Sequence, residues 1–238
     1  MSNINIMKTC FIISRYSEDI SWLEKLKDHK IIIYNKGQKL KTKSFDNILN
    51  VKNVGRESHT WLLHIVENYY SLDEVNVFLQ GRIDDLGCMA YKDPLEYFRK
   101  IDKYGFSVSR YGLLGPFHWS NNVGIEKDPR YKDKWQQNLI SKSELGFRKF
   151  SKKIFPKIPL FVATSYGGCF GVKKELILQH DIDFYKYLLK ILGSHKDPIE
   201  GHYLERLWCY MFTKNKPIKK SIIDVLTTKL ENFTKKIV

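Results

Sequence analysis

The chain has 238 residues, 43% hydrophobic and 14% aromatic, which is enough for one large domain with a buried core. This composition excludes intrinsic disorder, collagen and coiled coil, and no apolar run approaches the ~20 residues of a membrane helix. The formal net charge is +14, but 32 of the 40 basic residues are lysine and only 8 are arginine. Because arginine is the side chain best suited to paired phosphate and base contacts, no nucleic-acid partner is expected.

The first half of the chain reads as alternating strands and helices, which predicts an α/β sheet. Residues 9–14 form a β-branched strand, 19–27 have helical spacing and 30–34 form a second strand. A helix is expected over residues 56–70, because Trp61, Ile65 and Tyr69 recur at i, i+4 and i+8. Residues 75–79 are fully apolar, as in a buried parallel strand. Ligands of open α/β sheets gather at the carboxyl ends of such strands.

The second half is less regular. We expect a helix over residues 94–103, long ordered loops over 104–122, and short strands at 160–164 and 169–172 on either side of a turn. A helix starts near residue 174, and residues 199–212 form a strongly apolar, buried helix. From about residue 214 a basic tail follows, with an amphipathic helix from about Ile218. The whole of residues 1–238 is expected to be a single domain with this tail.

The cellular setting is predicted from three features. The N-terminal segment lacks the apolar core of a signal peptide, so we expect a cytoplasmic protein. The cysteines, none at C-x-x-C spacing, should be reduced, buried thiols; they are Cys10, Cys88, Cys169 and Cys209. Lysines alternate with apolar residues at 127–157 and 214–236, a pattern that also suits peripheral contact with an anionic membrane face.

A first candidate site lies at Asn53-Val54-Gly55-Arg56-Glu57. With Asn53 as the helix N-cap, Gly55 and Arg56 would occupy the first turn, where neither is locally favoured. One interpretation is a phosphate held by free backbone amides and the Arg56 guanidinium. The alternative is an ion pair between Arg56 and a carboxylate on a neighbouring loop.

A second candidate follows the buried strand, at Gln80-Gly81-Arg82-Ile83-Asp84-Asp85. Carboxylates at the end of a strand can hold Mg²⁺ or Mn²⁺ against a diphosphate. Asp84 and Asp85 are therefore candidate metal ligands. The alternative is a solvated turn in which one aspartate caps the next segment.

Two further candidate sites lie in the last third of the chain. Gly167 and Gly168 allow a sharp turn or a close approach to a ligand. On the apolar helix, His202 and Glu205 share a narrow polar face, so Glu205 is a candidate general base with a raised pKa unless Arg206 or a ligand compensates. A structural ion pair of Glu205 is the alternative; Glu200 and Asp197 are the next candidates for the base. His118, Trp119, His202 and Arg206 are candidates for a secondary or acceptor role.

The chain resembles a widespread family of proteins of unknown function that is related to GT-A fold glycosyltransferases. Seven blocks carry the resemblance, in order: Ser14-Arg15-Tyr16-Ser17-Glu18-Asp19 with Trp22-Leu23, Ile33-Tyr34-Asn35-Lys36-Gly37, Asn53-Val54-Gly55-Arg56-Glu57 with His59-Thr60, His64-Ile65-Val66-Glu67-Asn68-Tyr69, Val77-Phe78-Leu79-Gln80-Gly81, Gly167-Gly168-Cys169-Phe170-Gly171-Val172 and Leu204-Glu205-Arg206-Leu207-Trp208.

The resemblance implies a single-domain, GT-A-like (Rossmann-like) mixed sheet flanked by helices. It also implies that the loop holding Arg15, Tyr16 and Glu18 cradles a nucleotide base and that Arg56 faces the diphosphate. The double glycine would lie beneath the donor sugar, and Glu205 would deprotonate the acceptor.

The metal-binding D-x-D triplet of the GT-A fold aligns with Gln80-Gly81-Arg82. A Mn²⁺ or Mg²⁺ site would then have moved to Asp84 and Asp85, or Arg82 would replace the metal. The expected function is transfer of a sugar from a nucleotide diphosphate sugar, such as a UDP-sugar, to a carbohydrate or lipid-linked acceptor. The alternatives are a nucleotide-sugar-binding or hydrolysing protein on the same fold, or a basic adaptor for membrane or nucleic acid.

Overall fold

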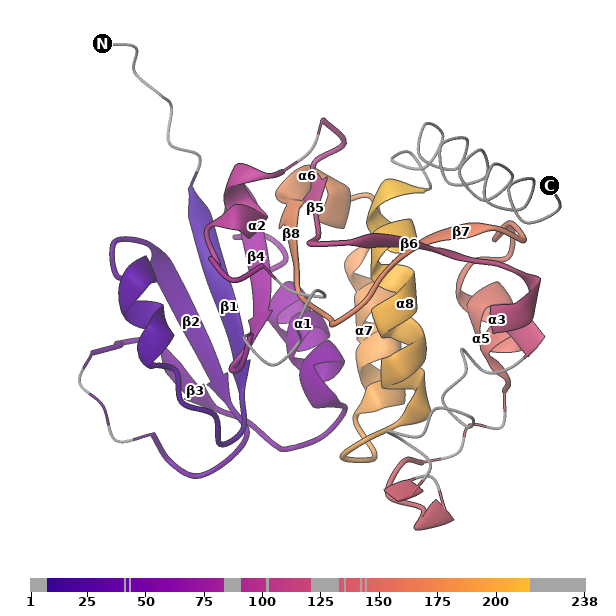
Figure 1. Cartoon of the computed structure of the whole chain (residues 1–238), viewed down its shortest axis with the longest axis horizontal. Coiled ribbons are helices and arrows are strands. Elements are labelled where there is room, and N and C mark those ends of the chain that lie inside the picture. Colours follow the sequence, from indigo (N-terminus) through magenta and orange to yellow (C-terminus); the bar gives the residue numbers. More distant parts are fainter. Residues whose placement is uncertain are drawn as a thin grey trace, which may run out of the picture.

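The computed structural model describes residues 8–40, 42, 44–83, 91–101, 103–120, 133–134, 136–141, 143 and 145–214. As the sequence predicts, the fold is a single-domain α/β fold, with a six-stranded mixed sheet flanked by helices (Figure 1). In the described ranges, no helix combines the length and the apolar character needed to cross a membrane. Cys10, Cys169 and Cys209 are free and buried, as expected, and Cys88 lies outside the described residues.

Four parallel strands form the core of the sheet: β1 (Thr9–Arg15), β2 (Lys30–Asn35), β3 (Ile48–Asn50) and β4 (Val75–Gln80). The strand order is β3-β2-β1-β4-β8-β5, in which β8 (Phe170–Lys173) is antiparallel to both β4 and β5 (Phe106–Ser107). All four parallel strands therefore end at one edge of the sheet, which lies at the bottom of Figure 1.

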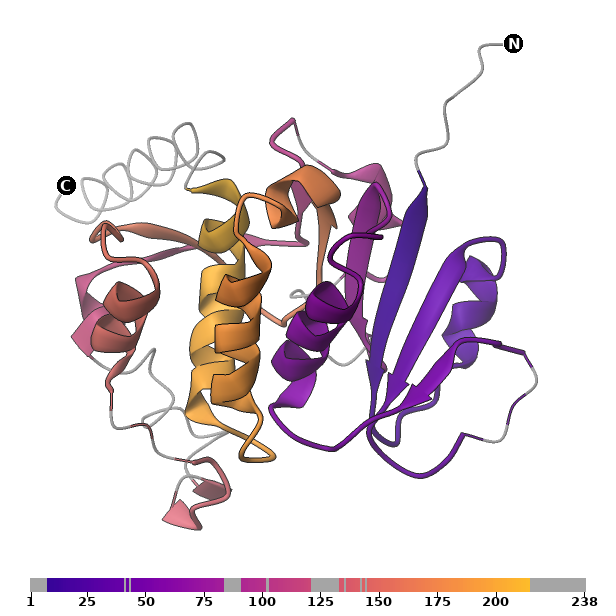
Figure 2. The same ribbon diagram turned by 180° about the vertical axis from the view of Figure 1, so that it is seen from behind.

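The central strands are apolar without alternation because both faces of the sheet are covered. Cys10 and Ile12 of β1 belong to the core beneath α1 (Arg56–Glu67) and α8 (Ile199–Thr213), whereas Phe11 and Ile13 face η1 (Ser21–Leu26) and α2 (Glu96–Arg99). The first face is seen from behind in Figure 2, where α1 lies beside α7 (Ile182–Leu192).

A second, two-stranded sheet pairs β6 (Tyr111–Leu114) with β7 (Val162–Ser165) in antiparallel register. Beside it lie α3 (Pro116–Ser120) and α5 (Phe147–Ile154). From β7 the chain turns through Gly167 and Gly168, both at positive φ (88° and 68°), into β8. A short helix, α6 (Lys174–Ile177), follows β8.

Several expected elements differ in extent. The segment at 19–27 is a 3₁₀ helix over Ser21–Leu26, and the helix expected at 94–103 is only Glu96–Arg99. The segment at 104–122, expected to be loop, holds β5, β6 and α3. Three further elements of the described residues were not predicted: β3, α5 and α7. The basic tail and its helix lie outside the described residues.

Candidate functional site

A cleft of about 640 Å³ lies at the carboxyl edge of the parallel strands. Its walls come from the ends of β1, β2 and β4, the start of α1, and the segment that precedes α8. From β1 the chain adds β2 and then β3 on one side of the sheet, and it then places β4 on the other side of β1. The direction in which strands are added therefore reverses between β1 and β4. This is the switch point at which open α/β sheets bind ligands. We call this site the carboxyl-edge cleft.

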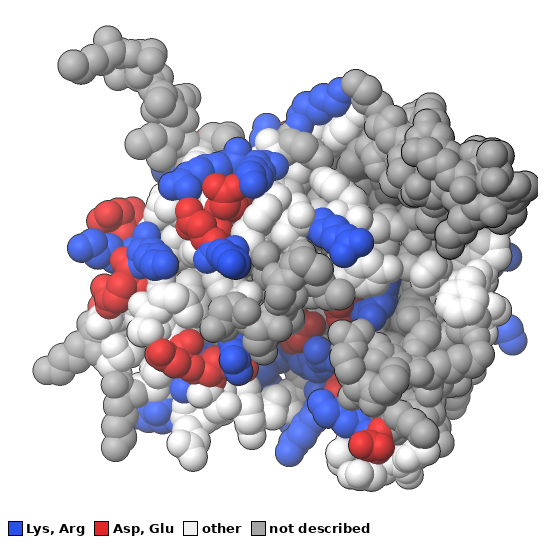
Figure 3. Space-filling model, in the orientation of Figure 1, with Lys and Arg blue, Asp and Glu red and all other residues white. Residues whose placement is uncertain are grey.

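The lining of the cleft is rich in cations. The basic residues are Arg15, Lys36, Arg56, Arg82, Lys134 and Lys196, and the acidic ones are Glu18, Glu57 and Asp197. Figure 3 shows blue side chains interspersed with red ones toward the lower middle of the molecule, where the parallel strands end. Clefts lined by an excess of one sign concentrate ligands of the opposite sign.

Seven of the donor-binding residues predicted from sequence line this cleft: Arg15, Tyr16, Glu18, Asn53, Arg56, Gln80 and Arg82. Four predicted glycines, Gly55, Gly81, Gly167 and Gly168, are not part of the lining but shape the turns behind it. The structure thus brings together residues that are up to 67 positions apart, from 15 to 82.

The loop after β1 is held in place by its own charged side chains. Arg15 donates from Nη1 to Asn35 Oδ1 at 2.7 Å and from Nε to the Glu18 carbonyl at 3.0 Å. Glu18 Oε2 accepts the amides of Tyr16 and Ser17 at 2.6 and 3.1 Å. Arg15 and Glu18 therefore shape the loop, and the exposed Tyr16 ring, 52% accessible, is the loop's aromatic surface.

The turn before α1 differs from the expected one. The N-cap is Gly55 rather than Asn53, and both Gly55 (φ 62°) and Arg56 (φ 51°) are left-handed. The prediction of free amides for a phosphate is wrong at these two residues, because Gly55 N donates to the His195 carbonyl at 2.8 Å and Arg56 N to that of Lys196 at 3.2 Å. An anion at this turn therefore cannot be bound by the amides of Gly55 and Arg56.

Lys36 is a site residue that the sequence analysis did not single out. It lies directly after β2, is only 9% exposed, and donates from Nζ to the carbonyls of Val54 (2.7 Å) and Arg56. Burial lowers the pKa of Lys36 to about 8, and the nearby Glu57 only partly offsets this. Lys36 thus clamps the left-handed turn that carries Arg56.

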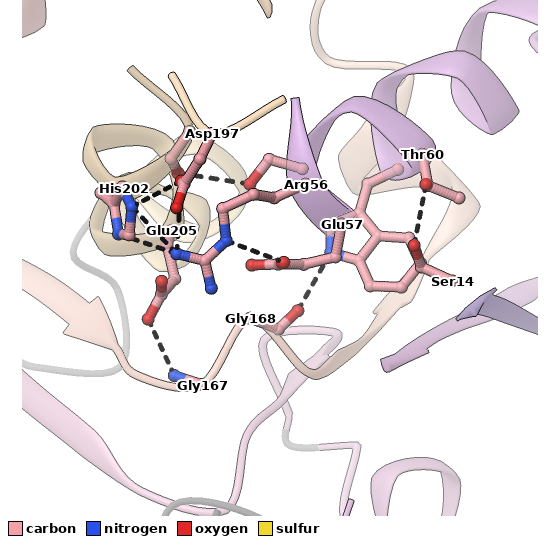
Figure 4. A network of polar contacts seen from close by, with 12 residues as sticks. Ser14, Arg56, Glu57, Thr60, Gly167, Gly168, Asp197, His202 and Glu205 are labelled. Atoms are coloured by element: carbon pink, nitrogen blue, oxygen red, sulfur yellow. Dashed lines mark hydrogen bonds and ion pairs between the residues drawn. The ribbon is translucent and has the colours of Figure 1, made fainter. Parts of the chain in front are cut away.

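Arg56 lies at the centre of a polar network that joins α1 to α8 (Figure 4). Its guanidinium is 3.4 Å from Glu57 Oε2 and 3.7 Å from Asp197 Oδ1. Its Nη1 lies 3.1 Å from Nδ1 of His202, whose Nε2 is 2.9 Å from Asp197 Oδ1. The same Arg56 Nη1 also lies 2.9 Å from His202 Nε2. In the tautomer that donates from Nε2 to Asp197, Nδ1 is the ring atom that accepts from Arg56. The alternative given for Arg56, an ion pair with a carboxylate, therefore fits these contacts, and its two partners are Glu57 and Asp197.

Asp197 faces the cleft while its partner His202 is fully buried. Burial raises the pKa of Asp197, but the hydrogen bond from His202 and the charges of Arg56 and Lys134 together hold it below its usual value. Asp197 is therefore an ionised carboxylate at neutral pH, oriented by a buried histidine.

Glu205 lies behind this network and is not part of the cleft lining. Its carboxylate is 3.0 Å from Arg206 Nη1 and accepts the Gly167 amide at 3.0 Å. Burial alone would raise its pKa, but Arg206, Arg56 and His202 outweigh burial, and the pKa of Glu205 is lowered. Arg206 therefore compensates the buried carboxylate, the raised pKa considered for Glu205 is not observed, and the alternative of a structural ion pair fits the observed contacts.

The double glycine lies beneath the cleft, against residues that line it. A Cβ at Gly168 would be 3.1 Å from Glu57 Oε1 and 3.3 Å from Gln80 Nε2, and the Gly168 carbonyl accepts from Trp61 Nε1 at 3.1 Å. Glu57 is itself 9% exposed. Glycine at 168 thus allows the turn to approach two side chains of the cleft.

A second cavity of about 650 Å³ adjoins the first and shares Ser17, Glu18 and Arg82 with it. Trp22 lines this cavity and donates to the Gly81 carbonyl at 2.8 Å. A Cβ at Gly81 would lie 2.9 Å from Glu18 Oε2, so a larger residue would displace the Glu18 carboxylate where the end of β4 meets the β1 loop. Arg82 is exposed between the two cavities.

The predicted metal ligands Asp84 and Asp85 lie outside the described residues. Within the described part of the chain, no group of three or more His, Cys, Asp or Glu could hold a metal ion. The cleft carboxylates also have other contacts: Glu18 with two amides, Glu57 with Arg56, and Asp197 with His202. The described residues therefore do not fit a divalent cation.

The secondary candidates His118 and Trp119 are not at the cleft. Both lie on α3, where His118 Nδ1 accepts the Gly115 amide at 3.1 Å and Trp119 stacks on Phe147 with ring centroids 4.8 Å apart. Trp119 is 7% exposed and packs in the core of the β6–β7 region. His118 stays half-buried on the same helix.

Comparison with known families accounts for most of the chain. Residues 11–221 match the family described as "Protein of unknown function (DUF3431)". The chain belongs to DUF3431. No curated protein and no solved structure matches it. The match to DUF3431 spans every residue of the carboxyl-edge cleft.

Among the charged residues of the carboxyl-edge cleft, sequence reasoning missed four as donor or catalytic candidates: Lys36, Glu57, Lys134 and Lys196. Lys36 had a detectable signal, because it directly follows a predicted strand at the edge where ligands gather. Lys196 precedes α8 and reaches the cleft only because α8 packs beside α1, which no local pattern indicates.

Proposed function

We propose that this protein is a glycosyltransferase that moves a sugar from a nucleotide diphosphate sugar to a carbohydrate or lipid-linked acceptor. The observation that carries the proposal is the cation-rich cleft at the switch point of the sheet. A nucleotide diphosphate sugar bears its negative charge in the middle of an extended molecule. It therefore needs a cationic centre with room on either side.

The two adjoining cavities, about 640 and 650 Å³, supply that room. Arg82 at their junction would face the diphosphate, and Lys196 would approach it from the α8 side. The base would lie in the cavity beside Trp22 and the β1 loop. The sugar would then lie above Gly168, next to Glu57 and Gln80. Arg56 would add positive charge even though it is paired with two carboxylates.

The acceptor hydroxyl needs a base, and Asp197 is the best placed carboxylate. It is ionised, it faces the cleft, and His202 orients it. A positioned general base typically accelerates a reaction roughly 10²- to 10⁴-fold. Glu205 is a weaker candidate because its ion pair with Arg206 lies behind the lining.

Fold analogy supports the proposal without carrying it. The sequence blocks that resemble proteins related to GT-A glycosyltransferases include Arg56, Gln80 and the double glycine, all of which lie in or against the cleft. A metal at Asp84 and Asp85 is part of the same proposal. If activity is independent of added Mn²⁺ or Mg²⁺ and survives excess chelator, Arg82 would take the place of the metal.

A thermal-shift screen of nucleotides and nucleotide sugars, with and without Mn²⁺, tests the proposal. A ligand at 100 times its Kd stabilises the folded state by about 2.7 kcal/mol. We expect one nucleotide diphosphate sugar to raise the melting temperature, and product analysis to show sugar transfer only with acceptor present. Hydrolysis without acceptor would favour the nucleotide-sugar hydrolase instead. No shift with any nucleotide would contradict both.

A further inference from the structure

The end of the molecule built from residues 105–120 and 145–165 has an unusual charge composition. These two segments contain no aspartate or glutamate, although the chain has 26 acidic residues. They form one region in space, because β6 pairs with β7 and α3 packs against α5. In Figure 1 this region lies at the opposite end from β2 and β3. We call it the acid-free end.

Basic side chains cover the outer face of α5. This helix buries Phe147, Phe150 and Ile154 toward the core. Its opposite face and the following loop carry lysines that are exposed; they are Lys149, Lys152, Lys153 and Lys157. Arg148 ties the same loop to α5 by donating to the Pro159 carbonyl at 3.0 Å, and its guanidinium lies 4.5 Å from the Trp119 ring centroid.

Three large apolar side chains are exposed at the same end. Phe117 is 65% exposed, and Leu160 and Phe161 are each 48% exposed. They lie near one another: the Phe161 ring is 3.0 Å from where a Cβ of Gly115 would be, and Trp119 Nε1 donates to the Leu160 carbonyl. Exposed aromatic and aliphatic side chains gathered on one surface are typical of an interaction site.

We propose that the acid-free end docks on the surface of an anionic lipid bilayer, with Phe117, Leu160 and Phe161 entering the headgroup region and the α5 lysines facing the lipid charges. Apolar insertion combined with lysine attraction is how interfacial helices and loops bind membranes. The absence of acidic residues from both segments removes the repulsion that anionic lipid would otherwise meet. Nucleic acid fits this surface less well, because lysine lacks the paired donors of arginine.

Vesicle flotation of the full chain tests this docking, using phosphatidylcholine vesicles with and without phosphatidylserine. One variant is Phe117→Ser with Phe161→Ser, and a second is Lys149→Glu with Lys152→Glu. The matched controls are Tyr70→Ser, at a site 89% exposed in the turn that follows α1, and Lys27→Glu with Lys190→Glu, at exposed sites elsewhere. All variants change exposed side chains, so melting temperatures should stay close to that of the wild type.

We expect binding only to vesicles with phosphatidylserine, weakened by high salt. The lysine variant should lower the partition coefficient by about 25-fold or more, from a contribution of about 1 kcal/mol per lysine. The phenylalanine variant should lower it by about tenfold, and both controls should match wild type. Unchanged binding by both test variants would overturn the proposal and assign any affinity to other parts of the chain. Salt-sensitive binding to a mixed-sequence RNA, without vesicle binding, would also overturn it.

Discussion

At the residue scale, Glu205 and Arg206 form a buried pair in which each side chain is about 10% exposed, with 3.0 Å between the charged atoms. Replacing Glu205 by Gln removes the negative charge and leaves Arg206 buried without it. We expect Glu205→Gln to lose stability, about 3 to 5 kcal/mol by analogy with other broken buried pairs. Glu200→Gln, on a half-buried position of the same helix, should stay within about 0.5 kcal/mol of wild type.

Chemical denaturation of the two variants measures this difference. If Glu205→Gln keeps the wild-type stability while turnover falls by orders of magnitude, Glu205 is the catalytic base and the ion-pair interpretation is wrong. The comparison separates the roles because the amide keeps the shape of the carboxylate but cannot accept a proton.

His64 makes the stability of the fold dependent on pH. Burial under the sheet lowers its pKa to about 4, and its Nδ1 lies 3.1 Å from the Tyr34 hydroxyl. The ordinary value near 6.5 applies to the unfolded chain, so the unfolded state binds the proton first as the pH falls. Stability is then fully present above pH 6.5 and is lost as the pH falls toward 4.

When the pH falls from 7 to 5, His64 binds a proton in the unfolded state but not in the native state. We expect this to lower the free energy of unfolding by about 2 kcal/mol. His64→Gln should be less stable than wild type at neutral pH, but its stability should fall less over this range. Urea denaturation of both proteins at a series of pH values gives the two slopes. If the unfolding free energies of the two proteins fall in parallel with pH, the native state takes up the proton at His64 as readily as the unfolded state does, and the lowered pKa of His64 is contradicted.

The site could be predicted from sequence where a local pattern marks a strand end. Gln80 and Arg82 were found because they follow a buried strand, whereas Arg15 was indicated only by the family resemblance; all three line the cleft. The orientation of Arg206 toward Glu205 depends on side-chain rotamers in a packed core, and adjacent positions on a helix do not indicate it. The left-handed turn at Gly55 was missed because the carbonyls that hold its amides come from His195 and Lys196, 140 positions away.

At the element scale, the cleft wall depends on a close backbone contact between two loops. A Cβ at Gly37 would lie 1.7 Å from the Tyr16 carbonyl oxygen, a backbone atom that cannot move alone. We expect Gly37→Ala to displace the loop of Arg15 and Glu18 and to cost about 3 kcal/mol or more. Gly193→Ala, where the nearest atom is 3.5 Å away, is the matched control and should be nearly neutral.

Thermal denaturation and nucleotide binding of both glycine variants measure the effect. Gly37→Ala should lose stability and ligand affinity together, since the same loop shapes both cavities. A Gly37→Ala protein with the stability and affinity of the wild type would show that the two loops separate without cost.

Three strands of the parallel core, β1, β2 and β4, were predicted correctly because their apolar runs are continuous and end at turn residues, whereas the short β3 was not predicted. Short elements that rely on distant partners were not: β5 and β6 pair with β8 and β7, more than 45 residues away in sequence. The helix α7 did carry a local signal, since the Asp181 side chain accepts the Phe184 amide as an N-cap and Tyr185, Leu188 and Leu192 are buried.

At the scale of the whole molecule, basic side chains of the described residues gather at two separate places. One is the carboxyl-edge cleft, where cations alternate with three carboxylates. The other is the acid-free end, where exposed apolar side chains accompany the lysines. A donor site and a membrane-docking surface at separate places would allow a lipid-linked acceptor to be presented to the cleft. The two proposals fail independently, because vesicle binding and nucleotide binding use different residues.

The central claim is that the carboxyl-edge cleft binds a nucleotide diphosphate sugar, and calorimetric titration tests it most directly. Wild type and an Arg82→Ala, Lys196→Ala double variant are titrated with a panel of nucleotide diphosphate sugars, with and without Mn²⁺; Lys27→Ala with Lys190→Ala is the control. We predict that one donor binds wild type and control equally, and that the double variant binds it about 100-fold or more weakly at an unchanged melting temperature, since each of the two charged contacts contributes about 1.5 to 3 kcal/mol. Equal affinity in all three proteins, or no binding by any donor, would contradict the claim.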